Sequence, residues 1–96
     1  MMLLSDNDIE KFLHSYDWGY SNNKISKLFS FNDYMDGIDF VMKIAELAEK
    51  RNHHPDIFIS WCKVEISLTS HEIGGVTMEC ISLAKDIENV LKMNNL

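Results

Sequence analysis

Three of the four histidines could take part in proton transfer. His53 and His54 are adjacent and are followed by Pro55, and His71 lies further along the chain. Imidazole exchanges protons readily near neutral pH, and catalytic side chains are commonly displayed on loops between scaffold elements. The three histidines are predicted beside helix or strand ends, where side chains from different elements can converge. The pattern favours acid/base chemistry, although a histidine at a helix end can serve only to hydrogen-bond exposed carbonyl groups.

A zinc site is the competing interpretation of these histidines and a cysteine. Zinc ligands recur as Cys-x-x-Cys or His-x-x-x-His pairs, and neither pattern is present. We therefore expect no metal ion. Cys62 and Cys80 fall in segments predicted as a strand edge and a helix, which suits free thiols in a reducing compartment. His14 falls in the first predicted helix and is expected to be solvated or partly packed, outside the site.

The elements that position the histidines can be predicted from capping residues and hydrophobic spacing. Ser5 can cap a first helix that runs to about Ser15, with acidic residues in its first turn. Asn22 and Asn23 are typical of a hairpin tip, so two short strands are expected around them, the second reaching about Phe31.

A second helix is the clearest element of the sequence. Asn32 and Asp33 can cap its start, and Pro55 disfavours helical backbone at His54, so the helix should end near Asn52. The double histidine is thereby placed just past a helix terminus. The expected apolar face comprises Met35, Ile38, Val41, Met42, Ala45 and Ala48 or Leu47.

Two further strands and a last helix follow. Ile57–Trp61 and Lys63–Leu68 are predicted as strands, and alternation in the second implies one buried and one solvated face. Gly74-Gly75 indicates a turn, and Thr77 can cap the last helix. The apolar side of this helix comprises Ile81, Leu83, Ala84, Ile87, Val90 and Leu91, and the tail from Met93 is expected to fray.

The resulting order, α-β-β-α-β-β-α, predicts an α+β fold of two layers, with the helices packed on one face of a four-stranded antiparallel sheet. Residues 1–96 are expected to form a single domain. The formal net charge of −6 argues against direct nucleic-acid binding, because that affinity comes mainly from lysine and arginine. No apolar run approaches the roughly 20 residues that span a bilayer, so a cytoplasmic protein without membrane contact is expected.

The chain resembles the pterin-4a-carbinolamine dehydratase family. The resemblance is carried by Glu-Lys-Arg-Asn-His-His-Pro from Glu49, then five residues to Trp61, nine more to His71, and Glu72 with Gly74-Gly75 after it. Further matches are Trp18, the segment Phe29–Tyr34 and the segment Ile81–Ala84. The resemblance therefore covers nearly the whole chain, from about Leu13 to Leu91.

The resemblance implies a hydro-lyase without metal or organic cofactor. Members dehydrate 4a-hydroxytetrahydrobiopterin to quinonoid dihydrobiopterin and water, in tetrahydrobiopterin recycling. By family position, His53 and His71 are the candidates for acid/base work, and His54 for holding the pterin and assisting transfer. Glu49, four residues before His53, could orient an imidazole or raise its pKa. Individual roles cannot be assigned from the sequence.

The resemblance also nominates residues for binding the substrate. Trp18 would provide an apolar wall, whereas Trp61 is expected to be structural. The positions that match the lining of the family's pterin pocket are Asn52, Thr69, Ser70 and Glu72.

Two positions depart from the family pattern. Cys80 stands where the family usually has an aspartate in the first turn of the last helix. If that aspartate only completes a capping box with Thr77, its loss costs at most about 1 kcal/mol, and Glu79 offsets part of it. If it orients the imidazole of His71, the enzyme should be slower. Ile57 replaces an aromatic residue, which affects the pocket rim or subunit packing.

Other functions are compatible with the same resemblance. Members can serve as dimerisation cofactors of a homeodomain transcription factor in animals, so a non-catalytic binding module is the alternative. A pure scaffold has no need of three imidazoles at the family spacing, which favours the enzyme. A role on a related pterin or molybdopterin is a third possibility. A homodimer joined edge to edge through its sheets is expected, and a homotetramer formed by helix packing is possible.

Overall fold

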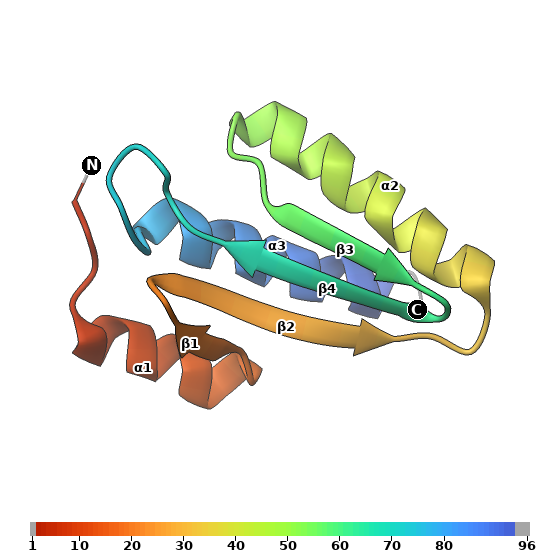
Figure 1. Ribbon diagram of the computed structural model, residues 1–96, viewed down its shortest axis with the longest axis horizontal. Coiled ribbons are helices and arrows are strands. Elements are labelled where there is room, and N and C mark those ends of the chain that lie inside the picture. Colours follow the sequence, from red (N-terminus) through yellow and green to blue (C-terminus); the bar gives the residue numbers. More distant parts are fainter. Residues whose placement is uncertain (1, 94–96) are drawn as a thin grey trace.

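The computed structural model describes residues 2–93 and contains three helices and four strands, in the order α-β-β-α-β-β-α (Figure 1). Their bounds are α1 Asp6–Tyr16, β1 Gly19–Ser21, β2 Lys24–Ser30, α2 Tyr34–Arg51, β3 Asp56–Ser60, β4 Lys63–Leu68 and α3 Met78–Met93. Within this range, no helix combines the length and apolar character needed to cross a membrane. The tail from Met93 was expected to fray; Met93 is the last residue of α3, and the rest of that tail lies outside the described residues.

The four strands form one antiparallel sheet in the order β1-β2-β4-β3. β4 is central and pairs with β2 on one side and β3 on the other, so that Val64 lies between Phe29 and Ile59. β1 and β3 are the two edges. The predicted α+β fold is confirmed, and the predicted bounds of β4 coincide with the observed ones.

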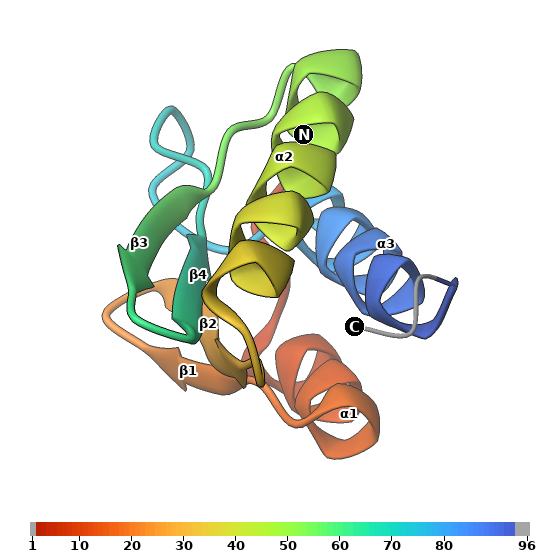
Figure 2. The same ribbon diagram turned by 90° about the vertical axis from the view of Figure 1, so that its right-hand side faces the viewer.

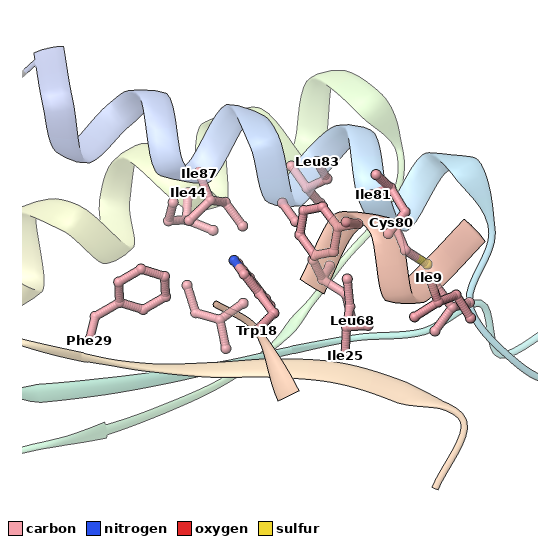
Figure 3. Close-up of a cluster of buried hydrophobic side chains, with 14 of the residues drawn as sticks. Ile9, Trp18, Ile25, Phe29, Ile44, Leu68, Cys80, Ile81, Leu83 and Ile87 are labelled. Carbon is pink, nitrogen blue, oxygen red and sulfur yellow. The ribbon is translucent and has the colours of Figure 1, made fainter. Parts of the chain in front are cut away.

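All three helices cover the same face of the sheet (Figure 2). On that face β4 contributes Val64, Ile66 and Leu68, all buried, as the alternation predicted. α3 contributes Leu83 and Ile87, which meet the strand residues in the core (Figure 3). One hydrophobic core therefore joins the helical layer to the sheet.

Local signals set several boundaries. The Ser5 side chain accepts a hydrogen bond from the Asp8 N–H (3.2 Å), so α1 has the predicted cap. Asn22 and Asn23 adopt positive φ angles of 52° and 61° at the tip of the β1–β2 hairpin. Asparagine tolerates this left-handed conformation better than other non-glycine residues, which explains the tight turn.

The apolar face of α2 agrees only in part with the predicted one: Ala48 is buried, and Val41 and Leu47 pack against the core, but the other buried positions were not predicted. The residues that pack against the sheet are Gly37, Phe40, Ile44 and Ala48, whereas Met35 and Met42 are exposed. The predicted and the observed sets of residues both have helical spacing, so periodicity alone could not show which set is buried. The choice depends on the sheet, because Phe40 packs against Phe29, with ring centroids 5.0 Å apart.

Trp61 is 78% exposed at the turn between β3 and β4, so it is not a core residue. The next residue, Cys62, has a φ of 57°, and its carbonyl accepts a hydrogen bond from the Phe31 N–H (2.9 Å). The β3–β4 turn, which carries this exposed residue, therefore lies at the end of the sheet near the start of α2 (Figure 1).

A polar cluster is centred on Glu88 of α3. The Glu88 carboxylate accepts from Lys27 Nζ (2.5 Å) and from Trp18 Nε1 (3.1 Å). Lys27 also donates to the Tyr16 carbonyl (3.0 Å) and lies 5.4 Å from the centroid of the Phe29 ring. The cluster joins α1, β2 and α3, and we call it the Glu88 cluster.

Candidate active site

A cavity of about 630 Å³ lies at the end of the molecule where α2 ends and α3 begins. The α2–β3 connection and the loop between β4 and α3 lie side by side there (Figures 1 and 2). The cavity is lined by Arg51, Asn52, His53, His54, Thr69, Ser70, His71, Glu72, Ile73, Thr77 and Glu79. All three candidate histidines and all four polar residues predicted to bind substrate are among these side chains.

The backbone at the C-terminus of α2 sets the positions of His53 and His54. Asn52 has a φ of 51°, in the left-handed region, and the His53 N–H donates to the Ala48 carbonyl (3.1 Å). This hydrogen bond satisfies a carbonyl of the last helical turn and reverses the chain at once. Pro55 then disfavours helical backbone at His54, so the chain continues toward β3 without resuming the helix.

Asn52→Val should lower the free energy of unfolding by about 1–2 kcal/mol, because a β-branched residue resists the left-handed conformation. Asn52→Gly removes the same amide but accepts this conformation freely, so its change should stay within about 0.5 kcal/mol. Urea denaturation of the two variants and the wild type measures the difference. Equal destabilisation by valine and glycine would show that the amide, and not the backbone, is what matters.

His71 lies on a short loop that is closed by Ser70. The Ser70 N–H donates to the Gly75 carbonyl (2.8 Å), and the Ser70 carbonyl accepts from the N–H of Gly74 (2.7 Å). Gly74 has a φ of 89°, which only glycine adopts without strain, and a Cβ on Gly75 would lie 2.9 Å from a methyl carbon of Leu3. The two glycines thus allow the tight loop that places His71 at the cavity.

Glu49 contacts His54, not His53. Its Oε2 atom lies 2.5 Å from His54 Nε2, and both side chains are largely exposed. α2 is still helical at Glu49, and the left-handed backbone at Asn52 lies between Glu49 and both histidines, so helical spacing no longer applies to His53. The carboxylate can therefore fix the ring orientation of His54 at the rim of the cavity.

His53 is the most enclosed of the three imidazoles. Burial lowers the pKa of His53, and the nearby positive charge of Arg51 and the two other histidines act in the same direction. Glu79 opposes them by raising it. The balance favours a neutral imidazole at neutral pH, a form that can accept a proton at one ring nitrogen and donate a hydrogen bond from the other.

Cys80 also reaches His53. Its Sγ atom lies 3.4 Å from His53 Nε2, and the side chain is fully buried in the first turn of α3. Cys80, at the position that departs from the family pattern, therefore contacts His53. The sequence suggested an orienting contact with His71 instead.

Trp18 lies in the core, away from the cavity. It is 4% exposed, packs against Phe12 and Phe29, and donates to Glu88 as part of the Glu88 cluster. Figure 3 shows its indole between the sheet and α3. The structure does not bring Trp18 together with the histidines as the predicted apolar wall.

Four lining residues were not predicted as part of the site: Arg51, Ile73, Thr77 and Glu79. Arg51 donates to Asp86 through Nε (3.1 Å) and Nη2 (2.5 Å) and lies 3.8 Å from Glu79, so it ties the end of α2 to α3. The sequence signal available for these four lining residues was their position close to the histidines along the chain. Among residues 2–93, no group of three histidine, cysteine or acidic side chains is arranged to hold a metal ion.

Comparison with known proteins decides the family. Residues 2–90 match the family described as pterin 4 alpha carbinolamine dehydratase. This chain belongs to that dehydratase family. A relative from Sulfolobus acidocaldarius, provisionally named pterin-4-alpha-carbinolamine dehydratase, is 37% identical over 90 residues, which cover 93% of this chain and 99% of the relative. A relative of the same provisional name from a Picosynechococcus strain is 43% identical over 82 residues, which cover 84% and 89%.

Solved structures agree with this dehydratase family assignment. A transcriptional coactivator/pterin dehydratase from Brucella melitensis superposes with a TM-score of 0.87 at 27% identity, covering 92% of this chain and 97% of its own. A pterin dehydratase-like protein identified as a RuBisCO assembly factor in the alpha-carboxysome gives a TM-score of 0.65 at 21% identity, covering 82% and 92%. The second likeness shows the fold alone.

Proposed function

We propose that this protein is a catalytically active pterin-4a-carbinolamine dehydratase that converts 4a-hydroxytetrahydrobiopterin to quinonoid dihydrobiopterin and water. The observation that carries the proposal is the convergence of His53, His54 and His71 on one cavity. Its volume, about 630 Å³, is within the usual range for small-molecule sites. The site works with protein side chains alone, in a cytoplasmic enzyme of tetrahydrobiopterin recycling.

Dehydration needs an acid and a base on one ring. The bond between C4a and the hydroxyl oxygen breaks as that oxygen receives a proton, and the ring N5–H loses its proton as the C4a=N5 double bond forms. His53 and His71, on separate loops, supply the acid and base functions. His54, oriented by Glu49, holds the pterin at the rim and assists transfer.

Polar residues of the cavity suit the donor and acceptor edge of a pterin. The Glu72 carboxylate can accept hydrogen bonds from ring N–H groups, and Ser70 and Thr69 provide hydroxyl and backbone groups beside it. Thr69 Oγ1 donates to the Asn23 carbonyl (2.7 Å), so the β1–β2 hairpin supports this wall. Asn52 is part of the lining as well.

The decisive experiment is stopped-flow absorbance of enzymatically generated 4a-hydroxytetrahydropterin. The protein should accelerate its decay in proportion to protein concentration. A decay no faster than in buffer would make this chain a non-catalytic binding module on a dehydratase fold, the role that a transcriptional dimerisation cofactor has.

The edge strand β3 supports a homodimer. Phe58 is 65% exposed on this strand, Ile59 and Trp61 are exposed beside it, and its outer edge has no strand partner within residues 2–93. An apolar, unpaired edge strand is a template for pairing with a second copy, which would join the two sheets. The exposed Met35 and Met42 of α2 suit a further helix contact between dimers in a homotetramer.

Phe58→Lys should convert the dimer to monomer, because it places a charge on each edge strand. Leu28→Lys is the matched control: both residues are cross-strand neighbours of Glu65, but Leu28 lies on β2, inside the sheet. Sedimentation velocity of the two variants and the wild type gives the masses. A monomeric wild type, or dissociation by Leu28→Lys alone, would contradict pairing through β3.

A further inference from the structure

The contact between Cys80 and His53 joins the core to the cavity. Sγ of Cys80 lies 3.4 Å from Nε2 of His53, and Oγ1 of Thr77 lies 3.7 Å from the same sulfur. Cys80 and Thr77 are fully buried, whereas His53 is half-buried and lines the cavity. The thiol therefore meets one ring nitrogen of His53 from the core side, and Nδ1 is the nitrogen left for other partners.

We propose that Cys80 is a positioning residue for His53: its S–H donates to Nε2, so that the neutral imidazole carries its own proton on Nδ1. An imidazole nitrogen is a good acceptor whereas thiol sulfur is a weak one, so this direction is the stronger of the two. The Thr77 hydroxyl can donate to the same sulfur, which aligns the three groups as a chain of donors.

The surroundings of His53 favour the neutral ring that this arrangement requires. The titratable and charged groups that face it are Arg51 at the end of α2, His54 in the connection after α2, His71 in the loop after β4, and Glu79 and Cys80 in α3. Burial is the largest cause of the lowered pKa of His53, and Glu79 is the group that opposes it. A carboxylate in place of the thiol would add a second negative charge and stabilise the imidazolium form.

The consequence for catalysis rests on the proposed function. With its proton on Nδ1, neutral His53 passes that proton to the departing C4a hydroxyl while Nε2 takes the thiol proton of Cys80, so the ring stays neutral and the sulfur is left as a thiolate beside the Thr77 hydroxyl. The base that takes the N5 proton is then His71. An aspartate at position 80 would accept from Nε2–H and leave a lone pair on Nδ1, so it would give His53 the opposite role. Cys80 thus selects between two assignments that the family resemblance leaves open.

Two-bond ¹H–¹⁵N NMR correlation of the histidine rings tests the proposal without substrate. In the wild type, His53 should be protonated on Nδ1 and unprotonated on Nε2, with its signals assigned by their loss in His53→Ala. Cys80→Ala should shift the ring toward the Nε2–H tautomer. Cys80→Asp should reverse the tautomer and raise the pKa of His53 by at least about one unit. A wild-type ring protonated on Nε2, or the same tautomer in all three proteins, would overturn the proposal.

A pH profile of kcat/KM adds a catalytic readout. Cys80→Asp should move the limb governed by His53 upward by at least about one pH unit, whereas a merely structural role would lower activity without moving the limb. A wild type inactive at every pH would refute the proposed function and leave the NMR result intact, so the two failures are distinguishable.

Discussion

His53→Ala should lower kcat/KM for dehydration of 4a-hydroxytetrahydropterin by about 10²- to 10⁴-fold near neutral pH. The variant removes a group that transfers a proton in the transition state, and general acid or base catalysis contributes on this scale. Stopped-flow absorbance of carbinolamine decay measures the loss. Cys80 and Glu79 remain in place in this variant. A loss of activity therefore reports on the missing imidazole and not on these neighbouring side chains.

His14→Ala is the matched control for that experiment. His14 is exposed in the last turn of α1 and is not a lining residue of the cavity. Its removal should leave kcat/KM unchanged within experimental error. Wild-type kcat/KM in His53→Ala, with the fold intact by circular dichroism, would contradict the role of His53 in catalysis.

Glu88→Ala should lower the free energy of unfolding by about 3 kcal/mol. It leaves Lys27 without its carboxylate and Trp18 Nε1 without its acceptor, and both side chains are mostly buried. Breaking a buried ion pair by removing one partner costs about 3–5 kcal/mol, and the partial exposure of this pair places the effect at the lower end. Urea denaturation followed by far-UV circular dichroism measures it.

Two further variants separate the ion pair from helix propensity. Glu46→Ala replaces an exposed glutamate of α2 and should change stability by no more than about 0.5 kcal/mol. Lys27→Met combined with Glu88→Leu removes both charges and should recover most of the stability lost in Glu88→Ala. A destabilisation of Glu88→Ala no larger than that of Glu46→Ala would show that the Glu88 cluster contributes nothing measurable.

The elements with strong local signals could be predicted from the sequence. The Ser5 cap, the Asn22-Asn23 hairpin and the end of α2 before Pro55 depend on nearby residues, and each lies where it was expected. The nearness of His53 and His71 could also be predicted from the sequence, because both were expected at the ends of elements that lie close together in an antiparallel sheet. Thr69 and Ser70 join the same cavity because they follow β4 directly.

The features that depend on distant parts of the chain could not be predicted in this way. The Lys27–Glu88 pair and the Cys80–His53 contact join residues 61 and 27 positions apart. The exposure of Trp61 depends on its place at a turn, and its residue type alone favours burial. Glu49 has the spacing to approach His53, but the backbone reversal after Arg51 gives its contact to His54.

The placement of the cavity in the connections has an evolutionary consequence. Its histidines lie after α2 and after β4, whereas the core is built from the faces of helices and strands between these connections. Substitutions in the loops can therefore alter the chemistry while the core sequence stays under its own, separate selection for stability. A gene of this kind can diverge toward a new role by exchanging a few loop residues, with the fold inherited unchanged.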